Sequence, residues 1–112
     1  MVLMTALVTL ADYAHARAGD KGNILSIAVF PLDEAHYAWL AREVTAERVA
    51  EHFASRRPDS VKRYTLDTLK ALNFVLENAL EGGVNQSPGL DRHGKSLSYL
   101  LLSMRVPAPP AR

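Results

Sequence analysis

The sequence predicts an α+β domain, a two-layer sandwich in which helices pack on one face of a mainly antiparallel sheet. The order of the predicted elements supports this fold class, and length and composition indicate the kind of domain. The predicted elements follow the order strand, strand, helix pair, strand, helix, strand, which is typical of two-layer packing. The chain has 112 residues and is 48% hydrophobic, as expected for one globular domain with a modest core. It contains no cysteine, which excludes disulfides and thiolate metal sites.

Two strands are predicted before the first helix. Residues 2–10 alternate with the two-residue period of a strand, and residues 24–30 are rich in branched side chains. The glycine-bearing segment between them, residues 15–23, interrupts this pattern. We therefore expect the two strands to pair as a hairpin that residues 15–23 connect.

The middle of the chain predicts two helices and a third strand. Asp33 and Thr45 are suitable N-caps for helices over residues 35–42 and 46–55, because their side chains can accept hydrogen bonds from the first turn. Residues 61–66 then have the composition of a short strand.

A third helix is predicted over residues 69–80. Its leucines recur at the i, i+3, i+7 and i+11 positions of a buried stripe, namely Leu69, Leu72, Leu76 and Leu80. The pair Gly82-Gly83 is a suitable C-terminal stop for this helix.

The last strand is predicted over residues 97–106, and the closest named architecture for the whole is a ferredoxin-like sandwich. Residues 1–106 thus form one domain. The proline-rich residues 107–112 are expected to be an extended, mobile tail, because proline joins neither a helix nor a strand ladder.

Composition excludes several classes of function. The 13 basic and 12 acidic residues give a formal net charge of +1, so there is no general attraction to nucleic acid or to an anionic membrane. The longest apolar runs fall far short of the roughly 20 residues that a membrane helix needs. The four histidines are scattered without ligand spacing, so we expect no metal and no cofactor. Together with the absence of cysteine, these features predict a cytoplasmic protein.

The segment His15–Asn23 carries the densest group of reactive side chains. Gly19 and Gly22 allow positive φ angles and can turn backbone N–H groups toward an anion. Arg17 and Lys21 can add charge-assisted hydrogen bonds to a carboxylate or a phosphate. The simpler interpretation is a hairpin loop with solvated charges, because an Asp-Lys pair between glycines is common in turns.

Asp20 and Lys21 are the candidate catalytic residues of this segment. Asp20 can act as a general base, or it can orient Lys21 or His15. The spacing matches neither a P-loop nor a dinucleotide-binding fingerprint. The segment by itself therefore does not specify a reaction.

Asn73 is a candidate for supporting this segment. It falls inside the leucine arc of the predicted third helix, and a buried amide needs hydrogen-bond partners, which the glycine-bearing loop can supply. In the alternative, Asn73 lies at the margin of the arc, and local backbone or water supplies its hydrogen-bond partners equally well.

Two other charged segments, the turn at residues 87–95 and the basic cluster at residues 56–63, are more typical of solvated surfaces. No aromatic residues are interleaved with the basic cluster, as nucleic-acid binding would require.

Four stretches of the sequence occur together in one family. They are ARAGDKGN at 16–23, VKRYTL at 61–66, LKALNFVLENALEGGV at 69–84 and LDRHGKSL at 90–97. In this order they resemble the C-terminal domain of AtuA-type acyclic terpene utilisation proteins. The resemblance implies a ferredoxin-like fold and a role in the catabolism of acyclic terpenes, a route that runs through acyl-CoA intermediates. It also implies that a larger domain accompanies this one, either fused to it or as a separate chain.

The resemblance assigns the family's loop and its asparagine to this chain. The matched ligand-binding positions are Gly19, Asp20, Lys21, Gly22, Asn23 and Asn73. The family's glycine pair and late turn match at Gly82, Gly83, Asp91, Gly94 and Lys95. Ser26 stands where the family usually has a second asparagine, and Arg17 is a candidate by proximity alone.

The leading functional expectation is an accessory subunit that docks on a larger AtuA-like chain, because the chain is small and has no complete catalytic constellation. The alternative is an enzyme subunit whose GDKGN loop binds an acyl-CoA or a carboxylate, with Arg17 and Lys21 on the anion and Asp20 moving a proton. Nucleic-acid binding through residues 56–63 is disfavoured, and no feature supports membrane attachment. A homodimer is a further expectation, because exposed strand edges in small sheets need cover.

Overall fold

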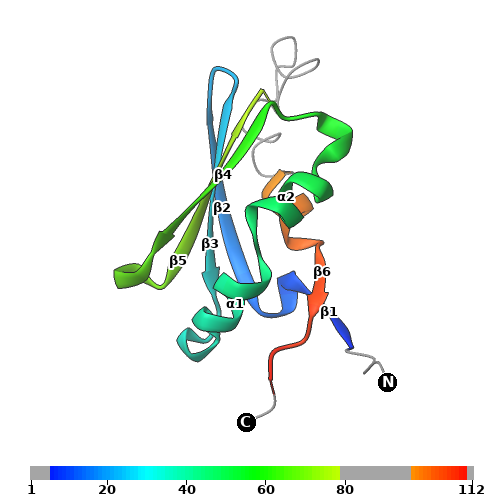
Figure 1. Ribbon diagram of the computed structural model, residues 1–112. Coiled ribbons are helices and arrows are strands. Elements are labelled where there is room, and N and C mark those ends of the chain that lie inside the picture. Colours follow the sequence, from blue (N-terminus) through cyan, green and yellow to red (C-terminus); the bar gives the residue numbers. More distant parts are fainter. Residues whose placement is uncertain (1–5, 79–96, 111–112) are drawn as a thin grey trace.

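Two antiparallel sheets form the framework of the fold. The computed structural model, shown in Figure 1, describes residues 6–78 and 97–110. The larger sheet has the strand order β2–β3–β5–β4, and a short second sheet pairs β1 with β6. The strands are β1 (Leu7–Thr9), β2 (Ala14–Lys21), β3 (Ile24–Pro31), β4 (Ser60–Leu66), β5 (Ala71–Glu77) and β6 (Arg105–Pro107).

The helices lie on one side of the larger sheet, as does the smaller sheet (Figure 1). The α-helical elements are α1 (Tyr37–Glu43), α2 (Ala46–His52) and a segment at residues 97–102. Short 3-10 helices are η1 (Leu10–Asp12), η2 (Glu34–His36), η3 (Ala54–Arg56) and η4 (Asp67–Leu69). The predicted α+β class, with an antiparallel sheet and helices on one face, is confirmed. In the described ranges, no helix is long and apolar enough to cross a membrane.

Both predicted N-caps are confirmed. The Asp33 carboxylate accepts a hydrogen bond from the Ala35 N–H at 2.9 Å, and the Thr45 hydroxyl accepts one from the Arg48 N–H at 3.1 Å. These side chains satisfy donors that the start of a helix leaves unpaired. Asp33 caps η2, which leads directly into α1, and Thr45 caps α2.

The hydrophobic core fills the space between the larger sheet and the helices. Its members on β3, β5 and the helices include Leu25, Ile27, Val29, Leu72, Phe74, Leu76, Trp39, Leu40 and Phe53. Hydrogen bonds from side chains join α1 to the smaller sheet and the larger sheet to the helices. The Trp39 indole N–H donates to the Pro107 carbonyl at 3.0 Å. Arg63 of β4 donates to the carbonyls of Ala41 and Val44, the latter at 3.0 Å.

The predicted connection over residues 15–23 is mostly strand, which corrects the sequence-based assignment. β2 pairs residue by residue with β3 and leaves only Gly22 and Asn23 in the turn. Gly22 has a φ of +63° and Asn23 has no positive φ, the pattern of a type II′ hairpin turn. The inward positions of β2 begin with three alanines, and alanine has a weak strand preference, so the sequence hid this strand. The expected partner, residues 2–10, contributes β1 instead, which pairs with β6.

The predicted helix over residues 69–80 is wrong in its described part, which is η4 followed by β5. Lys70 adopts a left-handed φ of 53°, which ends the turn of η4. Leu69 is 65% exposed, although the leucine stripe required it to be buried. The large buried side chains of β5 follow strand spacing at Leu72, Phe74 and Leu76. Short apolar runs fit both periods, and the pairing of β5 on both of its sides decides for the strand.

The predicted strand over residues 97–106 is also wrong over most of its length. Residues 97–102 are helical, and only β6 is extended. Leu97 and Leu101 are both buried, and their spacing of four is that of one helix face. The apolar alternation that predicted a strand therefore coincided with a helical pattern.

The C-terminal residues are attached to the domain beyond the predicted boundary at residue 106. Pro107 pairs with Leu7, and the Ala108 N–H donates to the Ala6 carbonyl at 2.9 Å. Proline is tolerated in this short edge strand because its missing N–H is not needed there. The predicted glycine pair at 82–83 and the charged turn at 87–95 lie outside the described residues.

Candidate functional site

The larger sheet has an inner face toward the helices and an outer face over which no described helix lies (Figure 1). Directly paired residues of antiparallel strands share a face, so the register defines this outer face. Its residues are His15, Arg17, Gly19 and Lys21 on β2, Ile24, Ser26, Ala28 and Phe30 on β3, Ala71, Asn73, Val75 and Glu77 on β5, and Ser60, Lys62, Tyr64 and Leu66 on β4. One row across all four strands contains Arg17, Ala28, Asn73 and Tyr64.

The two predicted catalytic residues lie on opposite faces of the sheet. Successive side chains of a strand point to opposite sides. Asp20 is half-buried on the inner side, whereas Lys21 is exposed on the outer face. Arg17 shares the outer face with Lys21. The structure therefore brings Arg17 and Lys21 onto one surface and separates Asp20 from both.

The turn at Gly22 and Asn23, which joins β2 to β3, is held at the end of β5. The Asn78 N–H donates to the Asn23 carbonyl at 2.6 Å, and the Asn78 side-chain amide donates to the Asp59 carboxylate. Asn78 has a φ of 62°, which directs the chain out of β5 at this point. Anion binding by residues 19–23 stays a prediction.

Asn73 lies at the centre of the outer face and not beneath the turn. Its Oδ1 accepts a hydrogen bond from the Ser26 hydroxyl at 3.2 Å, and both residues are half-buried. Its direct neighbours in register are Ala28 and Tyr64. Ser26 and Tyr64 were missed as site residues from the sequence. Only the pairing register of β5 with β3 and β4 places both on the same face as Asn73, and a strand assignment for residues 71–77 does not supply that register.

The outer face is positively charged. Arg17, Lys21 and Lys62 are exposed, and none of them forms an ion pair within the part of the chain that the structure describes. Among the described residues, Glu77 is the one carboxylate of the outer face, and its Oε1 accepts a hydrogen bond from the Ser60 hydroxyl at 3.0 Å. A cationic surface of this kind recognises carboxylates or phosphates.

A stacked ring pair occupies one corner of the outer face. The rings of His15 and Phe30 lie 5.0 Å apart between centroids with an interplanar angle of 11°. Direct pairing of these two residues between β2 and β3 produces the stack. The sequence offers His15 as a side chain that Asp20 can orient, but His15 lies on the outer face, where its ring stacks on Phe30.

A second hydrogen-bonded cluster joins α1 to η4. The Tyr37 hydroxyl donates to the Asp67 carboxylate at 2.7 Å, and the Lys70 ammonium lies 5.7 Å from the centroid of the Tyr37 ring. Burial raises the pKa of Tyr37, and the hydrogen bond to Asp67 raises it further. This cluster fixes the end of the sheet against the helices and contains none of the predicted site residues.

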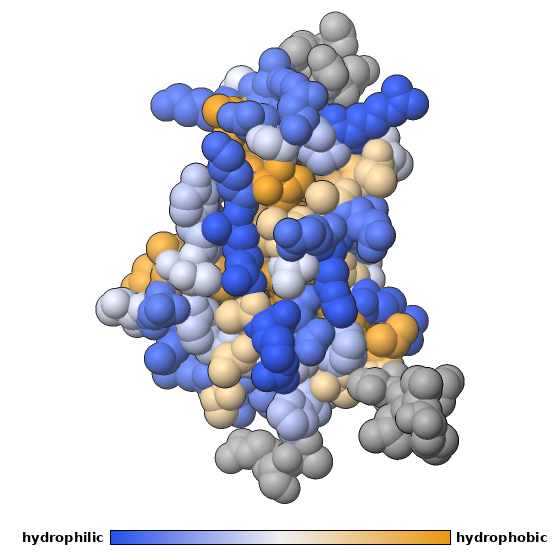
Figure 2. All heavy atoms as spheres, in the orientation of Figure 1, coloured by the Kyte–Doolittle hydropathy of each residue, from blue (hydrophilic) through white to orange (hydrophobic). Residues whose placement is uncertain are grey.

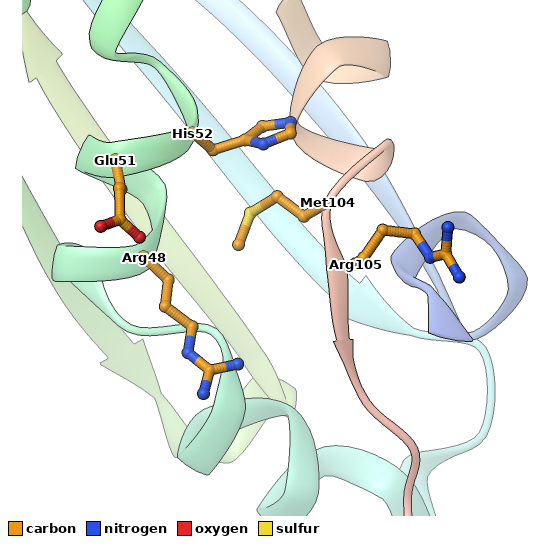
Figure 3. Close-up of a pocket in the computed structure, with 5 residues that line it drawn as sticks. All are labelled: Arg48, Glu51, His52, Met104 and Arg105. Atoms are coloured by element: carbon orange, nitrogen blue, oxygen red, sulfur yellow. The ribbon is translucent and has the colours of Figure 1, made fainter. Parts of the chain in front are cut away.

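A groove of about 440 Å³ lies on the helix side, lined by Arg48, Glu51, His52, Met104 and Arg105 (Figure 3). His52 Nε2 lies 2.7 Å from the Leu100 carbonyl, so this nitrogen carries a hydrogen that it donates. The side chains of Arg48 and Arg105 extend in different directions and do not meet at one point (Figure 3). The groove therefore lacks the convergent polar groups of a built ligand site. Outside the groove as well, hydrophilic side chains cover most of the surface visible in Figure 2.

Among residues 6–78 and 97–110, there is no cluster of three or more histidine, aspartate or glutamate side chains that could hold a metal ion.

In comparisons with known proteins, the family model of the AtuA ferredoxin-like domain matches residues 8–107. No curated protein and no solved structure gives a significant match. The matched region includes every described strand except the first residue of β1.

Proposed function

Because the chain belongs to the AtuA ferredoxin-like domain family, we propose that it is an accessory module that binds a larger AtuA-like chain. The complex would act in the catabolism of acyclic terpenes or of related acyl-CoA compounds. In this proposal the small chain contributes a binding surface, and the reacting groups belong to the larger chain.

The observation that carries this proposal is the separation of Asp20 from Lys21 across the sheet. A general base must come within hydrogen-bond distance of the proton that it removes. A ligand held by Arg17 and Lys21 on the outer face lies on the far side of the sheet from the Asp20 carboxylate. The alternative in which these residues form one acid–base site therefore has less support.

The dimensions of the outer face suit a protein interface. Four strands of seven or eight residues make a surface about 20 Å wide and about 25 Å long. A standard interface buries roughly 800 Å² on each partner. A partner that covers this face and its rim would therefore bury an ordinary interface area.

Co-expression with the larger AtuA-like chain from the same genome tests the proposal. We expect the two chains to copurify and to elute together in size-exclusion chromatography, with a mass that corresponds to a defined complex. Isolated small chain should show no turnover of terpenoid acids or acyl-CoA thioesters. Failure to form a complex at micromolar concentration, or turnover by the small chain alone, would contradict the proposal.

A further inference from the structure

The geometry of the outer face, taken together with the proposed function on which this inference rests, points to the chemistry of the partner. The outer face recognises an acidic protein surface with an uncharged centre. Arg17, Lys21 and Lys62 supply three positive charges, and Glu77 supplies one negative charge, so the described residues of this face have a net charge of +2. Within the described residues the three cations have no ion-pair partner. A surface with unpaired cations favours an oppositely charged partner.

The cations stand on the two edge strands of the sheet. Arg17 and Lys21 lie on β2, and Lys62 lies on β4. Between them, the middle of the two central strands presents small or uncharged side chains, all half-buried, at Ser26, Ala28, Asn73 and Val75, and the Glu77 carboxylate lies at the end of β5. An uncharged centre inside a polar rim is the usual arrangement of a protein–protein interface. The centre also carries the hydrogen bond between Ser26 and Asn73, which fixes its shape.

The spacing of the cations favours an extended partner over one small anion. Arg17 and Lys21 are four residues apart on one strand, so their backbones are about 13 Å apart. Lys62 lies three strands away from both, at about 15 Å. One carboxylate or phosphate group would engage one of these side chains well and the others poorly, whereas a protein surface can meet all three.

Two other extended occupants fit the face less well. A second copy of this chain would bring three cations opposite three cations, and like charges across an interface are repulsive. Single-stranded nucleic acid needs exposed aromatic rings for base stacking. On the outer face, Phe30 is already stacked against His15, and Tyr64 stands alone near an edge. An acidic protein surface therefore fits the described features best.

The test measures the affinity of this chain for the larger AtuA-like chain, with a double charge reversal on each side of the molecule. Arg17→Glu with Lys62→Glu alters both edges of the outer face and should weaken binding at least about tenfold. Arg57→Glu with Arg105→Glu makes the same change of charge at exposed positions away from that face, and should alter affinity less than about threefold. Wild-type affinity should also fall as salt rises.

Circular dichroism and thermal unfolding show whether each variant folds, and Arg17→Ala with Lys62→Ala replaces the double reversal if that variant does not fold. A wild-type complex that both charge reversals weaken equally would overturn the inference and leave the proposed function standing. No wild-type complex at all would overturn the proposed function and the inference with it. Self-association, or tighter binding to a single-stranded oligonucleotide than to the larger chain, would assign the face to a different occupant and also overturn the inference.

Discussion

Gly19 and Gly22 flank the same Asp-Lys pair, yet only Gly22 has a backbone conformation that favours glycine. Its φ of +63° lies in the left-handed region, and it occupies the first central position of a type II′ turn. Gly19 lies within β2 without a positive φ, and a Cβ added there would meet nothing within 4 Å. The sequence predicted one role for both glycines, and the structure gives them different roles.

Alanine substitutions separate the two glycines. Gly22→Ala should lower the free energy of unfolding by about 1–2 kcal/mol, because an L residue is strained at this φ. Gly19→Ala should change it by less than about 0.5 kcal/mol. Urea unfolding of both variants measures the difference. Equal losses would mean that the turn is not the type II′ turn described above.

Tyr37 provides a prediction for alkaline pH. Its folded-state pKa is raised above the ordinary value of 10.0 by burial and by the hydrogen bond to Asp67. The neutral hydroxyl is therefore favoured in the folded protein, and its stabilising contribution is present below about pH 10 and is lost as pH rises through the folded-state pKa.

Tyr37→Phe removes both the hydroxyl and this dependence. The variant should be less stable than the wild type at neutral pH, by about 1 kcal/mol. The difference should shrink as pH rises above about 10. Denaturant unfolding across this range measures the difference, with Tyr64→Phe, at an exposed tyrosine, as the matched control. A difference that is constant with pH would show that Tyr37 acts only by packing.

Elements with local signals were predictable from the sequence, and elements that depend on distant pairing were not. Asp33 and Thr45 cap their own helices through hydrogen bonds to residues two or three positions away, so a short window contains the whole signal. β5 depends instead on pairing with β4 and with β3, and the residues of β3 lie far along the chain. A helical period and a strand period both fit its leucines, and only the sheet distinguishes them.

Phe74 and Leu69 test the corrected assignment of residues 69–80. Phe74 is fully buried on β5, so Phe74→Ala should lower the free energy of unfolding by about 3–5 kcal/mol. Leu69 is 65% exposed, so Leu69→Ala should lower it by less than about 0.5 kcal/mol. Thermal or urea unfolding gives both values. A large loss for Leu69→Ala would support the helical stripe and contradict the strand.

Across the whole molecule, the two faces of the larger sheet have separate roles. The inner face holds the core, and the outer face carries the Ser26–Asn73 pair and three cations that form no ion pair within the described ranges. The sequence located the segment around Lys21 and the residue Asn73 as candidates, but their faces depend on strand register, which a single sequence does not contain. Asp20 groups with Lys21 in the sequence because residues 15–23 are assigned to a loop, in which successive side chains need not alternate between two faces. Ser26 is not a predicted site residue, and Lys62 is considered only within the disfavoured basic cluster at residues 56–63.

The neighbouring residues Arg63 and Lys62 test this division of roles, since they lie on opposite faces of β4. Arg63 donates to the Ala41 and Val44 carbonyls on the inner side. Arg63→Met keeps the aliphatic stem and leaves both carbonyls without this donor, so the free energy of unfolding should fall by about 2 kcal/mol. At temperatures where that variant is folded, its affinity for the larger chain should be unchanged.

Lys62→Met should give the reverse result. Its stability should stay within about 0.5 kcal/mol of the wild type, because the side chain is exposed and makes no described ion pair. Its affinity for the larger chain should fall and its salt dependence should weaken, because one rim charge is lost. Urea unfolding and titration of both variants against the larger chain give the four values needed. If the two substitutions altered stability and affinity in parallel, the inner and outer faces would not act independently, and the assignment of recognition to the outer face would be wrong.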